Sequence, residues 1–186
     1  MSYVVDPALP FVNSGTALGR AEIPIMLDRQ TPSAVSTVIT ATFVAGSQRK
    51  IILTYKGARG PADMYFGLRF NADSGTNYID LGALSNSAPS SDSSPSATLG
   101  YARLARFQAA AGAPGEWRAE IDPRTDGLYR TGRSRADSFT TGVIGLDEQR
   151  TQSFAWTDTA TNVTFFTIIA TAGSMTGVFE MWGVPS

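Results

Sequence analysis

The sequence contains no cysteine and no histidine among its 186 residues. Without cysteine the chain can form neither a disulfide nor a thiolate metal site, which fits folding in a reducing cytosol. Without histidine it cannot assemble a Ser-His or Cys-His nucleophilic system, or a histidine metal site. These two absences exclude many hydrolase mechanisms and many transition-metal sites.

Long apolar runs and a strong charge of either sign are also missing. No stretch approaches the roughly 18 apolar residues that indicate a transmembrane helix, and the opening residues, MSYVVDPALP, lack the pattern of an export signal. The net charge of -1 and the pI near 5.4 give no overall field that would collect nucleic acid or anionic membrane. Because nucleotide-binding glycine motifs are absent too, we expect a soluble protein with no cofactor, nucleic-acid partner or membrane partner.

What the sequence does hold is a composition typical of short strands joined by turns. It has 18 glycines, 10 prolines and 17% charged residues. Its length fits one domain, which we place at residues 21–186. Residues 1–20 carry isolated apolar side chains, Phe11 and Val12 among them, between prolines and glycines. We expect an extended N-terminal arm that docks on its own domain or on a neighbouring subunit.

Alternation of apolar and polar residues predicts a series of antiparallel β-strands. The predicted strands are 22–27, 34–45, 50–56, 64–70, 116–122, 128–130, 140–146, 149–158, 163–171 and 174–184. Pro24 suggests that the first is an edge strand. Residues 98–108 fit a strand or a short helix, and we favour the strand. Short turns predict three hairpins, joining 34–45 to 50–56, 140–146 to 149–158, and 163–171 to 174–184.

Two segments read as loops. Residues 83–97, ALSNSAPSSDSSPSA, are too poor in apolar surface to offset the entropy of ordering them. We interpret them as a long Ser/Pro-rich loop within one domain, with a domain linker as the alternative. Residues 131–135 are expected to form a basic turn.

The clearest strand leads into the clearest turn at residues 64–78, MYFGLRFNADSGTNY. Met64, Phe66, Leu68 and Phe70 alternate with other residues and therefore share one buried face. The polar run that begins at Asn71 then turns the chain. Its oxygen-bearing side chains resemble the spacing of a calcium loop, but a second carboxylate is missing, so we favour a metal-free turn in which side chains cap backbone groups.

The stretch LRFNADSGTNY resembles the "LRFNGD-SG-NY" signature of a β-sandwich module found in structural proteins of tailed bacteriophages. Ala72 stands where that signature usually has glycine. The ending, GVFEMWGV at residues 177–184, is similar to the closing strand of the same modules, with Trp182 in place of the usual tyrosine. The resemblance implies an all-β, antiparallel, jelly-roll-like β-sandwich in a homotrimeric virion protein that is assembled in the bacterial cytoplasm.

A basic cluster provides the candidate binding residues. Arginine side chains suit carboxylates on partner chains or acidic glycans. We select Arg118, Arg124, Arg130, Arg133 and Arg135, together with Phe11 and Val12 of the arm, as a binding or subunit interface. Arg103 and Arg106 belong to the same basic run, and a mixed solvated surface is the alternative interpretation. We expect no catalytic residue, cofactor site or metal site.

Three functions remain open on the sequence. The first is a non-catalytic virion structural protein, a capsid decoration or a tail fibre or accessory subunit, whose partners are major capsid or tail proteins. The second is a carbohydrate-binding module for host surface glycans, which would use exposed aromatic residues such as Trp117, Trp156 and Trp182, although we favour these as core. The third is a polysaccharide-degrading enzyme, for which Glu116, Glu120, Asp122 and Asp126 are the available carboxylates.

Overall fold

The computed structural model describes residues 23–85, 99–107, 109–124, 127–139 and 146–186. Within those ranges the chain forms eleven strands and no helix, and hence no helix of the length and hydrophobicity that crossing a membrane requires. The predicted arm at residues 1–20, with Phe11 and Val12, lies outside the described residues. So do residues 86–97 of the predicted Ser/Pro-rich loop.

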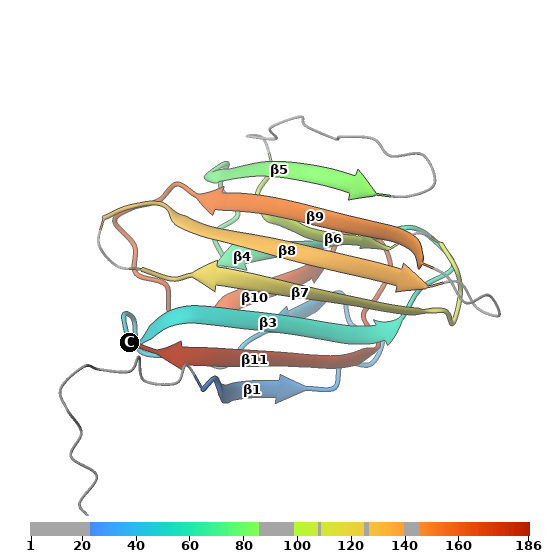
Figure 1. The fold of residues 1–186 in the computed structure, drawn as a ribbon, viewed down its shortest axis with the longest axis horizontal. Coiled ribbons are helices and arrows are strands. Elements are labelled where there is room, and N and C mark those ends of the chain that lie inside the picture. The colour runs from blue at the N-terminus through green and yellow to red at the C-terminus, as the bar shows by residue number, and fades with distance from the viewer. Residues whose placement is uncertain (1–22, 86–98, 108, 125–126, 140–145) are drawn as a thin grey trace, which may run out of the picture.

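The strands form two antiparallel sheets that pack face to face (Figure 1). The larger sheet contains, in spatial order, β1 (Ile25–Gln30), β11 (Gly177–Pro185), β3 (Gln48–Ala58), β7 (Pro114–Asp122), β8 (Arg130–Phe139), β9 (Leu146–Trp156) and β5 (Tyr78–Ser85). The smaller sheet contains β2 (Thr37–Ile39), β10 (Phe166–Ala170), β4 (Met64–Phe70) and β6 (Ala102–Phe107). The predicted all-β antiparallel sandwich is therefore confirmed.

An aromatic core fills the space between the sheets. Phe66 of β4 lies against Tyr55 of β3 and Trp117 of β7, with ring centroids 5.0 and 5.7 Å apart. Nearer the other end, the ring of Phe70 stacks on Trp156 of β9 at 5.1 Å. All five side chains are buried. Such rings remove large apolar areas from water and so account for much of the stability of the sandwich.

Several predicted strands are confirmed, and β4 has the predicted bounds. Its four alternating apolar side chains are buried, as expected from their shared face. The segment 98–108 contains strand β6 rather than a helix. β1 lies at an edge of its sheet, which agrees with the position of Pro24 just before it.

Two of the three predicted hairpins are wrong. β2 and β3 follow one another in the chain but belong to different sheets, and so do β10 and β11. β2 pairs with β10 instead, whereas β11 pairs with β1 and β3. Alternation shows which face of a strand is buried but not which strand lies beside it, so a short connection can lead either to a hairpin partner or to the opposite sheet. Only residues 37–39 of the predicted strand 34–45 are regular.

The polar strands account for the other corrections. The expected basic turn at 131–135 is part of the long strand β8, so the predicted short strand 128–130 is also wrong. The turn expected at Asp147 and Glu148 is part of β9. β5 runs through Ser85, three residues into the predicted loop. In each case charged or small residues alternate without the apolar pattern that marks a strand. Residues 140–145 of the third predicted hairpin lie outside the described residues.

Side chains close the sandwich at its β1 edge. Asp28 accepts a hydrogen bond from the backbone N–H of Ala41 at 2.8 Å. Gln30 donates one to the carbonyl of Ile39, also at 2.8 Å. β1 and β2 belong to different sheets. Hydrogen bonds from side chains therefore connect β1 to β2 and to the residues just after it, in place of the main-chain hydrogen bonds that join two strands of one sheet.

Candidate functional site

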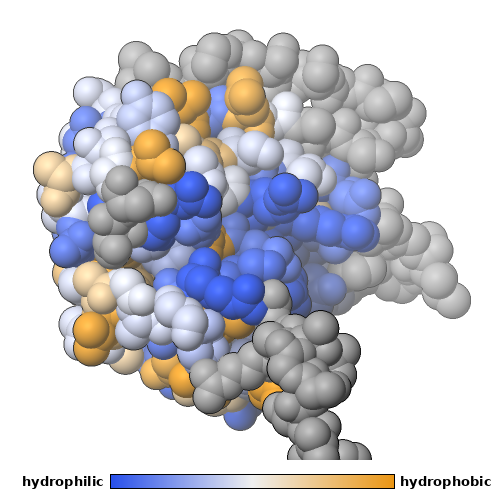
Figure 2. Space-filling view, turned by 60° about the vertical axis from the view of Figure 1, so that its left-hand side comes forward, coloured by the Kyte–Doolittle hydropathy of each residue, from blue (hydrophilic) through white to orange (hydrophobic). Residues whose placement is uncertain are grey.

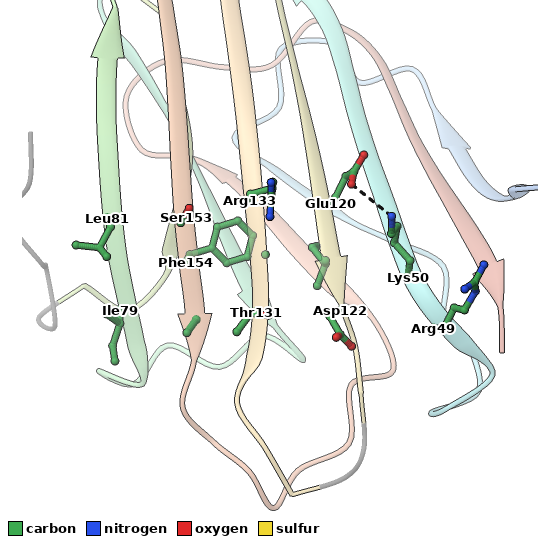
Figure 3. A pocket seen from close by; sticks show the side chains of 13 residues that line it. Arg49, Lys50, Ile79, Leu81, Glu120, Asp122, Thr131, Arg133, Ser153 and Phe154 are labelled. Carbon is green, nitrogen blue, oxygen red and sulfur yellow. Dashed lines mark ion pairs between the residues drawn. The ribbon is translucent and has the colours of Figure 1, made fainter. Parts of the chain in front are cut away.

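The outer face of the larger sheet is indented by two adjoining hollows of about 530 and 570 Å³. They share Glu120 of β7 and Arg133 of β8 as lining residues. We call them together the outer hollow. Its lining comes from five neighbouring strands, β3, β7, β8, β9 and β5 (Figure 3). The candidate site is therefore carried by a rigid sheet rather than by loops.

Strand register fixes which side chains meet on this face. Arg133 lies opposite Glu120 on one side and opposite Ser153 of β9 on the other. Ser153 in turn lies opposite Leu81 of β5. Because side chains directly opposite one another in an antiparallel pair lie close together, an acid, an arginine, a hydroxyl and an aliphatic group form one row across the hollow.

Glu120 is held by two cations. Arg118 contacts its carboxylate at 3.0 Å and Lys50 at 3.6 Å. Burial tends to raise the pKa of Glu120, but the hydrogen bond from Arg118 and the charge of Lys50 outweigh it and hold the pKa below its usual value. Glu120 is thus an ionised group whose charge is already balanced twice over.

The other charges of the hollow are paired in the same manner. Lys56 contacts Glu116 at 3.0 Å, and Arg135 contacts Asp137 at 3.1 Å. Exposed ion pairs such as these contribute about 0–1 kcal/mol to stability each, so their importance is electrostatic rather than structural.

Figure 2 shows the end of the sandwich that lies at the left of Figure 1. Hydrophilic residues gather across the middle of that end, and apolar residues lie around them.

Arg133 differs from every other described cation. Among the lysine and arginine side chains that the structure describes, it alone makes no hydrogen bond and no ion pair. It is exposed and lines both parts of the hollow. The neighbouring carboxylate of Glu120 is engaged by Arg118 and Lys50, so the positive charge of Arg133 is left without a counterion.

The wall formed by β5 is apolar. Ile79 and Leu81 are 38% and 53% exposed, so this wall presents aliphatic surface to the solvent. Both line the hollow, as does the hydroxyl-bearing Ser153 between Leu81 and Arg133 (Figure 3). The hollow thus offers an unpaired guanidinium, neighbouring hydroxyl and carboxylate groups, and one aliphatic side.

The structure gathers only part of the predicted arginine cluster. Arg118, Arg133 and Arg135 share the outer hollow. Arg124 lies in the chain after β7 and binds the carboxylate of Asp122, with its Nε donating at 2.8 Å. Two further arginines, Arg103 and Arg106, belong to β6 in the other sheet. Phe11 and Val12 are outside the described residues.

Arg130 does not belong to a surface at all. Its side chain is fully buried, and the guanidinium lies over the ring of Trp156, 5.6 Å from the centroid. It donates hydrogen bonds to the carbonyls of Asp158 and Thr161, the latter at 2.9 Å. Arg130 therefore anchors the chain after β9 to the start of β8, and its assignment to a partner interface is corrected.

The turn at residues 71–77 is built from side-chain caps. Asp73 Oδ1 accepts from the backbone N–H of Gly75 at 2.8 Å. Its Oδ2 accepts from Asn77 at 2.9 Å and from Trp156 Nε1 at 2.7 Å. Burial raises the pKa of Asp73, but these donors more than compensate and leave the pKa below its usual value. This is the capped turn that the sequence favoured over a calcium loop, with the Asp73 oxygens bonded to protein donors.

The tryptophans are divided between core and surface. Trp117 and Trp156 are 2% and 1% exposed, so neither can stack on a sugar, and the core interpretation is confirmed for both. Trp182 is half-buried on β11, and its Nε1 donates to Glu180 at 3.3 Å. It does not line the outer hollow.

Sequence reasoning missed Lys50, Ile79, Leu81 and Ser153 as members of the hollow. Lys50 and Ser153 are separated from the arginines by many residues and reach them only through strand pairing. A signal for β5 was present, because Ile79 and Leu81 alternate with Asp80 and Gly82. That alternation is typical of a strand, but it does not indicate that the side chains of Ile79 and Leu81 face the solvent rather than the core.

Comparisons with protein families, with curated proteins and with solved structures found no match to this chain.

Proposed function

We propose that this protein is a non-catalytic structural subunit of a tailed-bacteriophage particle, present as a capsid decoration or as a tail fibre or accessory protein. The observation behind the proposal is that residues on which the resemblance to the phage modules rests also hold the sandwich together. Asn71 accepts a hydrogen bond from the backbone N–H of Thr164 at 2.9 Å, just before β10. Tyr78 donates from its hydroxyl to the carbonyl of Asp73 at 2.9 Å. The resemblance to the phage modules therefore rests on side chains that hold the turn and the neighbouring strands of the sandwich in place.

The β1 edge supplies a surface suited to subunit contact. Ile23, Ile25 and Ile39 are 71%, 48% and 59% exposed. Ile25 and Ile39 lie on the two segments that Gln30 ties together. Exposed aliphatic groups along a sheet edge favour association over solvation. We assign this edge to contact with a second copy in a homotrimer or with a capsid or tail protein.

The carboxylates of the outer hollow suit this non-catalytic role. A glycosidase needs a carboxylic acid whose pKa is raised so that it can donate a proton. The pKa of Glu120 is instead lowered, while Glu116 and Asp122 are ion-paired with Lys56 and Arg124. Asp126, the fourth sequence candidate, lies outside the described residues. Each of these three carboxylates thus has its charge balanced by a nearby lysine or arginine.

Two measurements test the proposal. Light scattering coupled to size-exclusion chromatography should report a trimer, and Ile25→Asp or Ile39→Asp should convert it to monomer without lowering the melting temperature, because both side chains are exposed. Immunogold electron microscopy of purified particles should then place the protein on head or tail. If the wild-type protein is a monomer at every concentration, the proposed trimer is wrong. If purified particles carry no label, the proposed assignment to the virion is wrong.

A further inference from the structure

We infer that the outer hollow binds an anionic polysaccharide and that Arg133 receives the anionic group of the sugar chain. This inference goes beyond the structural role proposed above and does not depend on it, because it rests on the side chains of the hollow alone. The ligand class follows from three properties of this face: an uncompensated cation, central strands that are paired on both sides, and neighbouring hydroxyl and aliphatic groups.

The first property is the charge of Arg133. Three cations, Lys50, Arg118 and Arg133, surround the single carboxylate of Glu120, and only the first two contact it. The guanidinium of Arg133 is exposed at the point where the two parts of the hollow meet. A planar guanidinium binds carboxylate or sulfate oxygens through two parallel N–H donors. The hollow therefore selects a ligand with a negative group at this place.

The second property separates a polysaccharide from a peptide. Peptides that bind to sheets commonly add a strand at an edge and gain affinity from main-chain hydrogen bonds. β7, β8 and β9 are each paired with a strand on both sides, so their backbone groups are already used. Recognition on this face has to come from side chains, which suits a ligand whose own hydrogen-bonding groups are hydroxyls along its length.

The third property is the distribution of partners for such hydroxyls. Ser153 lies opposite Arg133 on β9 and Thr131 lies two residues before it on β8, both exposed, and the carboxylate of Asp122 lies in the same part of the hollow (Figure 3). Leu81 provides an aliphatic surface beyond Ser153. Sugar rings present both hydroxyl edges and apolar C–H faces, so one chain can use both kinds of group while its acid contacts Arg133.

The test uses isothermal titration calorimetry of the full chain at low ionic strength. Polygalacturonate supplies carboxylate groups, dextran sulfate supplies sulfate groups, and dextran is the neutral polymer. At least one charged polymer should bind, and its affinity should fall with added salt. The ratio of the two affinities identifies the preferred anion. Equal binding of neutral dextran, or no binding of either charged polymer, would overturn the inference.

Two arginine variants make the test specific for the site. Arg133→Gln should weaken binding by about tenfold or more, as expected for the loss of a charge-assisted hydrogen bond. Arg29→Gln is the matched control, because Arg29 is an exposed arginine of the same sheet that pairs with Glu180 outside the hollow. Both variants should keep the wild-type melting temperature. Unchanged binding by Arg133→Gln, or equal losses in both variants, would contradict the assignment.

A third variant and a fourth polymer address the remaining features. Leu81→Asp places a negative charge on the aliphatic side and should also weaken binding of the charged polymer, while the exposed position keeps the fold intact. Poly-glutamate tests the distinction between sugar and peptide and should bind more weakly than the preferred polysaccharide at matched charge. Equal or tighter binding of poly-glutamate would assign the hollow to acidic protein segments and overturn the inference.

Discussion

A single methyl group costs this protein stability at Ala72. Both Asn71 and Ala72 have positive φ angles, 49° and 60°, a conformation that asparagine tolerates and alanine does not. Ala72 occupies the position at which the resembling phage signature usually has glycine, and the structure shows why glycine suits it.

Ala72→Gly should raise the free energy of unfolding by about 0.5–1 kcal/mol, because relief of the left-handed strain exceeds the entropy that glycine adds to the unfolded chain. Urea denaturation monitored by tryptophan fluorescence measures the change. Ala62→Gly is the matched control, since Ala62 is an exposed loop residue outside the positive-φ set. It should be neutral or slightly destabilising, and a loss of stability in Ala72→Gly would contradict the account.

Asp80 makes stability depend on pH. Its side chain is 1% exposed on the inner face of β5, and burial raises its pKa to about 6 against the opposing effects of the Arg103 backbone N–H and charge. The folded state therefore binds this proton more tightly than the unfolded state, whose aspartate pKa is about 3.9. Stability from this group is greatest below pH ~4 and is lost as the pH rises to about 6.

Asp80→Asn should remove this dependence. Its advantage over the wild type in free energy of unfolding should be small at pH 4 and should reach about 2–3 kcal/mol above pH 7. Urea unfolding of the two proteins across that range measures the difference. Parallel curves, with a constant difference between wild type and variant, would show that Asp80 does not titrate in this window.

The candidate site was predictable from the sequence only in part. Arg118, Arg133 and Arg135 were selected as members of a basic run, with Arg133 and Arg135 expected in a turn, and the structure brings all three together on one face of the larger sheet. The unpaired state of Arg133 could not be predicted, because it depends on Lys50 reaching Glu120 across the pairing of β3 with β7. Arg130 looks the same in the sequence, yet the local fold buries it.

At the scale of elements, the turn 71–77 joins parts of the molecule that are distant in the chain. It connects β4 in the smaller sheet to β5 in the larger one. Asp73 within it binds the indole of Trp156 on β9, and Asn71 binds the chain before β10. One short turn thus ties both sheets to each other at this end of the sandwich.

Asp73→Ala should lower the free energy of unfolding by about 2–4 kcal/mol, because it leaves the buried indole N–H of Trp156 without its acceptor. Since the pKa of Asp73 is lowered in the folded state, its contribution is present above pH ~4 and is lost as the pH falls below that value. Thermal melting at pH 7 and pH 3 tests both statements. A chelator should leave the melting temperature unchanged, and a drop of several degrees would indicate a bound cation instead.

Strand identity was predictable in β3, β4 and β7, where an apolar face alternates with a polar one. β8 was missed because its inward residues are small. Gly132, Ser134 and Ala136 face the interior between outward arginines, so no hydrophobic alternation appears. The ring of Phe154 lies where a side chain of Gly132 would be, which explains how glycine can fill an inward position.

At the scale of the whole molecule, composition and alternation were sufficient for the fold class but not for the pairing of strands. Of the ten steps between successive strands that the structure describes, eight pass from one sheet to the other. Only β7 to β8 and β8 to β9 stay within one sheet. A short loop with a glycine suits a hairpin and a crossing equally well, so the local sequence cannot decide between them.

These crossings mean that neither sheet corresponds to a continuous stretch of the gene. A break anywhere between β2 and β10 leaves two fragments, each of which carries strands of both sheets. The molecule cannot be split into one layer and the other by protease or by truncation. A fragment that ends or begins between β2 and β10 therefore carries parts of both sheets and completes neither of them.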